Sequence, residues 1–280
     1  MKIGFVGMTH LGIVSSIAAA EKKYNIICYD KNIKKINELK KSNFGIKEPN
    51  LNKLYKKNLK KIHFTNNITD LNTASLVYVS MDIKTNSNGK SNYSELNSMI
   101  EKIIQNLSKK IILVIFCQIS PGFTRNINWP KNKLYYQVET LIFGRAFKRA
   151  LEPERIIIGK YNNNKLPTAL YSFLKKFNCP ILDMNYESAE LCKISINLYL
   201  ISQVTTTNSI NEISKKIGAN WDDIKIALKL DSRIGKHAYL NPGLGISGGN
   251  LERDLNSVKI LGKKNKSAIS LFDSFEYLSK

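Results

Sequence analysis

Short apolar runs alternate with stretches of helical spacing through the first half of the chain. Residues 3–6 and 25–29 are apolar runs of strand length, and the alanine-rich residues 11–20 between them have the character of a helix. A strand, a helix and a second strand in this order form the βαβ unit of a parallel sheet. Further strand-like runs occupy residues 76–80, 111–116, 134–136 and 155–159. The alternation predicts an α/β fold with a doubly wound, Rossmann-like sheet.

The pattern changes in the second half of the chain. Residues 165–177 look helical, and residues 187–217 keep apolar positions at helical spacing for many turns. Residues 242–250, PGLGISGGN, are too rich in glycine for a helix, so we expect a loop with unusual backbone angles. We therefore predict a Rossmann-like domain over residues 1–183, followed by a mainly α-helical domain with a long central helix over residues 184–280.

Composition and charge narrow the classes of partner. The chain has 280 residues, of which 43% are hydrophobic, enough for a sizeable core. Its net charge of +21 is spread along the chain and forms no single basic tail. A positive field attracts polyanions, but no zinc-finger spacing, helix-turn-helix signature or RNP motif is visible. Nucleic acid is thus not the expected partner, and a dinucleotide or a small phosphorylated ligand fits the charge better.

Cysteine spacing and hydropathy bear on the compartment. The four cysteines are far apart and form no CxxC pair, which is typical of reduced thiols in a cytosolic protein. Residues 1–20 are apolar, yet they contain three glycines and lead directly into a second strand-like run, so they are interpreted as a buried strand and helix and not as a signal peptide. No other segment reaches the roughly 18 uninterrupted apolar residues that a membrane span needs. We expect a cytoplasmic protein without a membrane partner.

A glycine-rich motif opens the first predicted helix. Its sequence is Gly7-Met8-Thr9-His10-Leu11-Gly12, and Asp30 closes the second strand. A helix N-terminus offers free N–H groups to a pyrophosphate, and an acid about twenty residues further on can bind the adenosine ribose hydroxyls. The context predicts a dinucleotide site formed by Gly7, Thr9, His10, Leu11, Gly12 and Asp30.

Two features of this motif affect which cofactor it can bind and how closely. Asp30 would repel a 2′-phosphate and so favours NAD over NADP, although Lys31 and Lys34 weaken that preference. Thr9 stands where the middle glycine normally lets the backbone approach the pyrophosphate, and its side chain would push a cofactor outward. The alternative hypothesis is a Rossmann-like fold that has lost its cofactor.

Several motifs follow one another in a recognisable order. After the glycine motif come EPNLNKLY at 48–55, SPGFT at 120–124, LEPERIIIG at 151–159, AELCKISIN at 189–197, and LDSRIG followed by PGLGISGGNLERD, which ends at Asp254. In these motifs the chain resembles the UDP-glucose/GDP-mannose dehydrogenase family. The resemblance implies an NAD-dependent oxidoreductase of polysaccharide biosynthesis, similar to UDP-glucose 6-dehydrogenase, which oxidises a hydroxyl of a sugar or sugar nucleotide. It also implies a homodimer, because the long helix at 187–217 resembles the dimerisation element of the family.

The resemblance also implies a set of catalytic residues. Lys193 and Asn197 lie four residues apart on a predicted helix, so both leave one face and can hold one substrate oxygen. They look like the family's catalytic pair, in which the lysine stabilises the alkoxide as hydride leaves. Asp254 would work with Lys193 on a water or proton relay, and Glu139 would serve later acid–base steps, although VETLIFG around it departs from PEFLREG. Taken alone, these residues would be an exposed lysine, a surface asparagine and an acid at a helix N-terminus.

Further residues are placed at the ligands by the same resemblance. Arg233 resembles an arginine that reaches the substrate, in some relatives from a neighbouring subunit, whereas a solvated surface charge is the alternative. Gly245 and Gly248 belong to the glycine-rich loop near the substrate, and Thr124 of SPGFT is placed near the cofactor. No metal is expected.

One departure bears on the reaction. In the family the glycine-rich loop carries a cysteine whose thiolate attacks the aldehyde formed first, and Asn250 stands in its place here. Cys192 is adjacent to Lys193 and so points about 100° away on the helix, and Cys117 lies in a strand-like context that favours packing. We therefore expect oxidation to stop at the carbonyl.

Other departures leave a second hypothesis open. Ile83-Lys84-Thr85 replaces the family's Thr-Pro-Thr, and Cys117-Gln118-Ile119 replaces its Ser-Thr-Val. The sequence ends at Lys280, whereas relatives continue into a third domain that grips the nucleotide. The substrate is then smaller, or a partner completes the site, or the chain is a catalytically silent member that binds a nucleotide sugar or a partner enzyme. A basic nucleic-acid-binding protein on a Rossmann scaffold is the weakest reading.

Overall fold

The computed structural model describes residues 1–85, 91–246 and 250–278. The chain divides into two compact units, which are described separately. The first comprises Met1–Lys84 and Asn92–Lys193, and the second comprises Thr85–Ser91 and Ile194–Lys280. The boundary between the units thus lies inside the long helix, ten residues beyond the domain boundary expected from the sequence, which stays a prediction.

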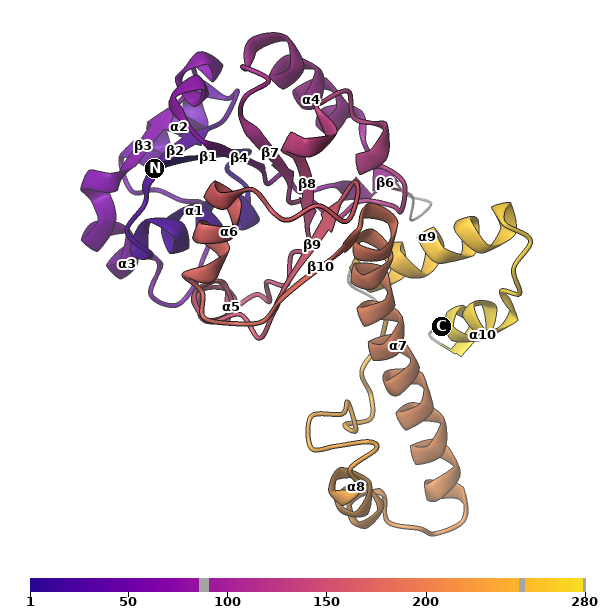
Figure 1. Ribbon diagram of the computed structural model, residues 1–280. Coiled ribbons are helices and arrows are strands. Elements are labelled where there is room, and N and C mark those ends of the chain that lie inside the picture. Colours follow the sequence, from indigo (N-terminus) through magenta and orange to yellow (C-terminus); the bar gives the residue numbers. More distant parts are fainter. Residues whose placement is uncertain (86–90, 247–249, 279–280) are drawn as a thin grey trace. The chain divides into compact units, whose positions relative to one another are not determined.

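An eight-stranded sheet forms the centre of the first unit (Figure 1). Its strands are β1 (Lys2–Val6), β2 (Asn25–Tyr29), β3 (Ile62–Thr65), β4 (Leu76–Val79), β7 (Ile112–Ile115), β8 (Leu134–Gln137), β9 (Ile156–Lys160) and β10 (Ile181–Asn185). They follow the order β10-β9-β8-β7-β4-β1-β2-β3. Neighbouring strands from β3 to β8 are parallel, β9 is antiparallel to β8, and β10 is parallel to β9. The direction of winding reverses between β1 and β4, where open α/β sheets bind their ligands.

Helices cover both faces of this sheet. One face packs against α1 (His10–Glu21), α2 (Ile33–Lys40), α3 (Leu51–Asn58), α5 (Ala146–Leu151) and α6 (Thr168–Lys175), and the other packs against α4 (Ser94–Asn106). Adjacent residues of β1 point to opposite faces of the sheet: Phe5 packs in the core on the α1 face, and Val6 packs in the core on the α4 face. The predicted doubly wound fold is therefore confirmed.

The connections of the first unit contain the 3₁₀ turns η1 (Leu59–Lys61), η2 (Ile68–Thr73), η3 (Thr124–Asn126) and η4 (Lys131–Lys133). Two short strands that pair with each other, β5 (Lys84–Thr85) and β6 (Ser91–Asn92), lie at the ends of the segment Thr85–Ser91, which belongs to the second unit.

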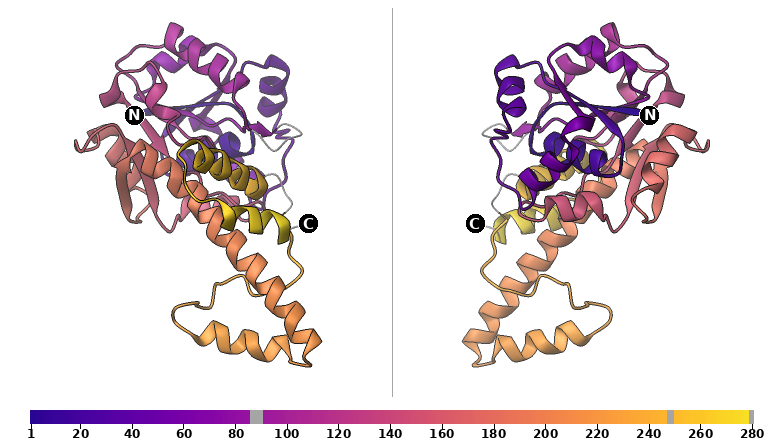
Figure 2. Two further views of the ribbon diagram at one scale, coloured as in Figure 1. Left: turned by 90° about the vertical axis from the view of Figure 1, so that its right-hand side faces the viewer. Right: turned by 90° about the vertical axis from the view of Figure 1, so that its left-hand side faces the viewer.

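The helix α7 (Tyr186–Lys216) starts in the first unit, and its larger part is the longest helix of the second unit. Figure 2 shows α9 (Asn250–Lys264) and α10 (Ser270–Leu278) beside α7, with α8 (Trp221–Leu230) near its far end. A small core joins α7, α9 and α10 through Ile201, Leu255 and Phe275. The indole of Trp221 donates to the carbonyl of Leu240 at 3.0 Å and ties α8 to the segment before the glycine-rich loop. The prediction of a helical second half with a long helix is confirmed.

The sequence pattern missed the two edge strands of the main sheet and the short strands β5 and β6, and it placed the end of the glycine-rich loop one residue too late. Strands β3 and β10 are the two edges of the sheet, and their sequences IHFT and ILDMN carry polar residues, because an edge strand is only partly covered. The predicted loop at 242–250 was drawn one residue too long, since α9 begins at Asn250; residues 247–249 lie outside the described part. In the described residues, none of the helices is long and apolar enough to cross a membrane.

Candidate active site

The two outer glycines of the fingerprint are required by the backbone. Gly7 adopts φ +91°, a left-handed conformation that favours glycine, and its N–H donates to the carbonyl of Tyr29 at 2.9 Å. A Cβ atom on Gly12 would lie 1.9 Å from the carbonyl oxygen of Gly7. Gly7 therefore permits the tight turn after β1, and Gly12 permits α1 to pack against that turn. These are the roles that glycines play in a dinucleotide fingerprint.

Thr9 immediately precedes α1 without capping it. Its side chain makes no capping hydrogen bond, and its hydroxyl instead donates to the carbonyl of Ser80 beyond β4 at 3.1 Å. The side chain in place of the middle glycine is thus bound to the neighbouring strand end. The N-terminus of α1 keeps the electrostatic character that favours an anion.

Asp30 lies next to the fingerprint. One carboxylate oxygen accepts from the N–H of Met8 at 3.0 Å and lies 3.3 Å from the amine of Lys35, and the other accepts from the N–H of Asn32 at 3.0 Å. Asp30 is thus held where a ribose hydroxyl is expected. A hollow of about 330 Å³ adjoins this corner. It is lined by Met8, Thr9, His10, Ile13, Lys35, Glu38, Leu39, Asn43, Phe44, Gly45 and Ile46.

A buried carboxylate joins the fingerprint to the loop after β8. The Glu48 side chain has no exposed surface; it contacts the His10 ring nitrogen at 2.8 Å and accepts from the N–H groups of Gly144 at 2.9 Å and Ala146 at 3.3 Å. Burial opposes ionisation of Glu48, but these hydrogen bonds outweigh burial and lower the pKa of the carboxyl. The sequence placed Glu48 in a motif and gave it no role, because a carboxylate that binds distant backbone N–H groups has no spacing signature.

Lys193 and Glu139 form an ion pair within the first unit. The lysine amine lies 3.0 Å from a Glu139 oxygen, and the two side chains are 11% and 15% exposed. The other Glu139 oxygen accepts from the N–H of Leu141 at 3.0 Å. The structure thus brings together two predicted site residues, one from α7 and one that follows β8.

Asn197 and Asp254 form a second pair, within the second unit. The Asn197 amide donates to an Asp254 oxygen at 2.6 Å, and Arg253 Nε lies 3.9 Å from the other oxygen. Asn197 and Asp254 are both buried. The alternative of an exposed lysine and a surface asparagine is therefore wrong, since Lys193 is largely covered and Asn197 is buried. A contact of Asp254 with the lysine itself stays a prediction.

The remaining predicted residues are less directly placed. Arg233 is an exposed guanidinium, 87% accessible, that pairs with Asp231 at 2.6 Å. Thr124 and Leu11 are buried, so Thr124 offers no side-chain surface to a ligand. Asn250 is the first residue of α9, Gly245 lies in an exposed part of the preceding loop, and Gly248 falls outside the described residues. The ligand roles of these residues stay predictions.

Of the two cysteines considered as substitute nucleophiles, Cys117 is not suited to that role. Cys117 is fully buried, donates to the carbonyl of Val79 at 3.0 Å and accepts from the N–H of Met81 at 3.3 Å. Burial raises its pKa to about 12, so the thiol stays protonated at neutral pH. Cys192 is partly buried and packs against the apolar core on the α4 face. The expected packing role of Cys117 is confirmed.

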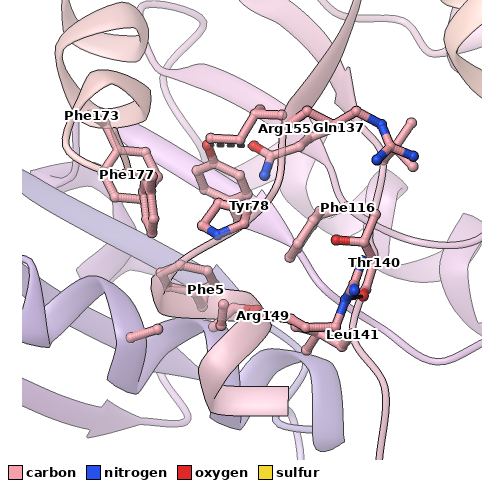
Figure 3. Close-up of a pocket in the computed structure, with 16 residues that line it drawn as sticks. Phe5, Tyr78, Phe116, Gln137, Thr140, Leu141, Arg149, Arg155, Phe173 and Phe177 are labelled. Carbon is pink, nitrogen blue, oxygen red and sulfur yellow. Dashed lines mark hydrogen bonds between the residues drawn. The ribbon is translucent and has the colours of Figure 1, made fainter. Parts of the chain in front are cut away.

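A separate cavity lies inside the first unit (Figure 3). It measures about 60 Å³ and lies on the sheet face covered by α1, α5 and α6, with Phe5, Tyr78, Phe116, Phe173 and Phe177 among its walls. Tyr78 donates to the Gln137 side chain at 3.1 Å. The volume is far below the roughly 300 Å³ at which ligand pockets begin. The cavity contains none of the predicted site residues and is interpreted as packing space. Within the described ranges, no group of three or more His, Cys, Asp or Glu side chains could hold a metal ion.

Comparison with known proteins connects this geometry to a family. Residues 1–177 match the NAD-binding domain of the UDP-glucose/GDP-mannose dehydrogenase family, and residues 187–278 match its central domain. A UDP-glucose 6-dehydrogenase of Rickettsia typhi is 28% identical over 277 residues, which cover 95% of this chain and 64% of that protein. The UDP-glucose 6-dehydrogenase TuaD of Bacillus subtilis is 26% identical, with 94% of this chain and 59% of the relative covered. The chain thus spans less than two thirds of these relatives.

Solved structures share the fold. A UDP-glucose dehydrogenase from Pyrobaculum islandicum superposes with a TM-score of 0.89 at 20% identity, over 99% of this chain and 67% of that one. A UDP-D-ManNAc dehydrogenase from Pyrococcus horikoshii gives 0.86 at 20% identity, over 100% and 68%. The matched NAD-binding domain confirms NAD as the cofactor of the first unit. Both domain matches together cover nearly the whole sequence, and the chain belongs to the UDP-glucose/GDP-mannose dehydrogenase family.

Proposed function

We propose that this protein oxidises a hydroxyl of a sugar or sugar nucleotide with NAD and releases the carbonyl product. The observation that carries the proposal is the pair of polar contacts on α7. Lys193 is bound to Glu139 and Asn197 is bound to Asp254, and the lysine and the asparagine are one helical turn apart. An ammonium and an amide on one face of a helix can bind one alcohol oxygen and stabilise the negative charge that develops on it.

Each group has a chemical task in the proposed reaction. The turn at Gly7 and Gly12 with the start of α1 would hold the pyrophosphate of NAD, and Asp30 would bind its ribose. The bound nicotinamide would accept the hydride. The Lys193 ammonium would stabilise the substrate oxygen as its proton is lost, and Asn197 would donate a hydrogen bond to the same oxygen. In balance, alcohol and NAD⁺ give carbonyl, NADH and one proton.

We expect the carbonyl compound to be released as the product, because the nucleophile for a second oxidation is missing. A second hydride can leave only after a nucleophile or water has added to the carbonyl carbon, and Asn250 stands where the family has its cysteine. Cys117 is a buried, protonated thiol and offers no replacement. We therefore expect one NADH for each substrate molecule.

The test is a stoichiometric assay with UDP- and GDP-sugars. NADH is followed by absorbance while a hydrazine reagent traps the carbonyl product, and NAD binding is measured separately by calorimetry. One NADH per trapped carbonyl supports the proposal. Two NADH per substrate would overturn release at the carbonyl, and absence of NAD binding would overturn the enzymatic function.

A second candidate function is a silent family member that binds a nucleotide sugar or a partner enzyme. Thr9 at the middle position of the fingerprint favours it, because a side chain there restricts the approach of a pyrophosphate. The same calorimetric experiment discriminates the two functions. A silent member binds a UDP- or GDP-sugar without turnover, whereas the proposed enzyme binds NAD and reduces it.

We further propose a cytoplasmic homodimer, with α7 and α8 at the interface. Large apolar side chains are exposed along these helices: Tyr199, Ile210, Ile213, Ile217, Ile226 and Leu230. Ile210 and Ile213 are three residues apart on α7 and therefore lie near one face of it, and Ile217 directly follows the helix. Exposed apolar stripes of this kind are typical of protein contacts. Analytical ultracentrifugation should give twice the chain mass, and Ile213→Lys should shift the protein toward monomer.

A further inference from the structure

Three charged residues at intervals of three line the first turns of α7. Glu187 pairs with Arg125 at 2.8 Å, Glu190 binds the backbone of the SPGFT loop, and Lys193 pairs with Glu139. Residues three apart lie near one face of a helix. Their partners follow β7 and β8, which are parallel, so these contacts tie two loops at one edge of the sheet to α7.

Glu190 is the buried member of this row. It has no exposed surface, and its carboxylate oxygens accept from the N–H of Gly122 at 2.5 Å and from the N–H of Thr124 at 2.9 Å. A buried carboxylate is costly unless hydrogen bonds compensate it. Two backbone donors meet the carboxylate here, in a loop where Gly122 adopts φ +91°. Turns of this kind form concave groups of N–H donors that bind anions.

The other end of the loop is also held by a side chain. The hydroxyl of Tyr93, just before α4, contacts the Ser120 hydroxyl at 2.8 Å and accepts from the Ser120 N–H at 2.9 Å. The loop is therefore attached both beside α4 and on α7. On α7, Glu190 makes the buried attachment, and the ion pair of Glu187 with Arg125 is a partly exposed one that follows the loop. Lys193 follows Glu190 by less than one turn of the same helix.

We propose that Glu190 is a positioning residue that holds the SPGFT loop against α7 and thereby sets the wall of the nicotinamide end of the cofactor site. The role is indirect, because the carboxylate is buried and its oxygens are bound to the backbone of the loop. The inference rests on the proposed function: with the adenosine ribose at Asp30 beyond β2 and the pyrophosphate at the start of α1, the nicotinamide half of NAD would lie across the switch point, on the β4 and β7 side, where this loop follows β7. A purely structural glutamate would affect unfolding and leave the affinity for NAD unchanged.

The test compares Glu190→Gln with the matched variant Glu187→Gln. Glutamine has the same shape but offers one acceptor oxygen, so its NH₂ group faces one of the two loop N–H groups and one hydrogen bond is lost. Glu187 lies one turn earlier and is 38% exposed, so loss of its ion pair should matter little. Hydrogen exchange at Gly122 and Thr124 should be about tenfold faster in Glu190→Gln. The dissociation constant for NAD should rise at least about fivefold, and Glu187→Gln should leave both unchanged.

The possible outcomes separate the two levels of the proposal. Unchanged loop exchange in Glu190→Gln would overturn the attachment, and faster exchange with unchanged NAD affinity would overturn the positioning role. Should the wild type fail to bind NAD, the proposed function fails by itself, while loop exchange still tests the attachment. If Glu190→Gln does not fold, hydrogen exchange of the wild-type protein tests the attachment. The Gly122 and Thr124 amides should then exchange as slowly as those of β7, and fast exchange would refute the attachment.

Discussion

Replacing Gly12 by alanine is the sharpest test of the cofactor turn. The added Cβ atom would lie 1.9 Å from the carbonyl oxygen of Gly7 and 2.9 Å from the hydroxyl oxygen of Ser80. The first of these atoms belongs to the backbone, so no side-chain rotation can relieve the contact. The turn between β1 and α1 must move, and the same turn is the proposed pyrophosphate site.

Two opposing terms set the size of the effect. Alanine favours a helix interior over glycine by about 1 kcal/mol. Overpacking a well-packed site costs about 1–3 kcal/mol, and a contact of this length with backbone belongs at the upper end of that range. The net loss in the free energy of unfolding should therefore be about 2 kcal/mol, which changes the folding equilibrium by roughly thirtyfold.

Urea denaturation followed by circular dichroism measures the loss, and calorimetry measures the affinity for NAD. Gly262→Ala is the matched control, because that glycine also lies in a helix and its added Cβ would meet the Ile269 Cγ2 atom, which can move. The control should stay within about 1 kcal/mol of the wild type. If Gly12→Ala keeps the stability and the NAD affinity of the wild type, the reasoning is refuted.

Three further predictions concern the proposed site. Lys193→Met should abolish turnover and leave NAD affinity within about twofold, because the lysine acts on the substrate oxygen; turnover above a tenth of the wild-type rate would contradict this. Glu48 has a lowered pKa, so its stabilisation is present above the ordinary value of 4.5 and is lost as the pH falls through the folded value. The urea midpoints of wild type and Glu48→Gln should differ at pH 7 and converge in acid. A difference between the midpoints that does not change with pH would contradict a lowered pKa of Glu48. Asn250→Cys should raise the NADH yield per substrate from one toward two, and an unchanged yield would show that the nucleophile does not limit the second step.

The sequence predicted those parts of the fold that are buried on both faces. Continuous apolar runs at β1, β2, β4 and β7 were recognisable because parallel strands inside a sheet touch helices on each side. The edge strands β3 and β10 lacked this signal. Their positions depend on tertiary pairing with β2 and β9, which no local pattern reports.

The candidate site was predictable to a different extent. Helical spacing alone placed Lys193 and Asn197 on one face of α7. Their partners Glu139 and Asp254 are more than fifty residues away along the chain, so only the resemblance to a family indicated them. The buried carboxylate of Glu190 was missed, because it binds backbone N–H groups, and every residue except proline carries such a group.

The pattern of retained and replaced residues separates the two halves of the family's chemistry. Removal of the first hydride needs a cation and a hydrogen-bond donor at the alcohol oxygen, and a group to take up the proton. In the proposed reaction Lys193, Asn197 and the carboxylates bound to them would meet that need, and each is held by a contact that limits its freedom. The second hydride needs, in addition, a nucleophile that adds to the carbonyl carbon, and by the resemblance to the family Asn250 stands where a cysteine would serve that step. A chain under no catalytic constraint would have no reason to keep one set of groups and exchange the other, so this division favours a single oxidation over a silent binding protein.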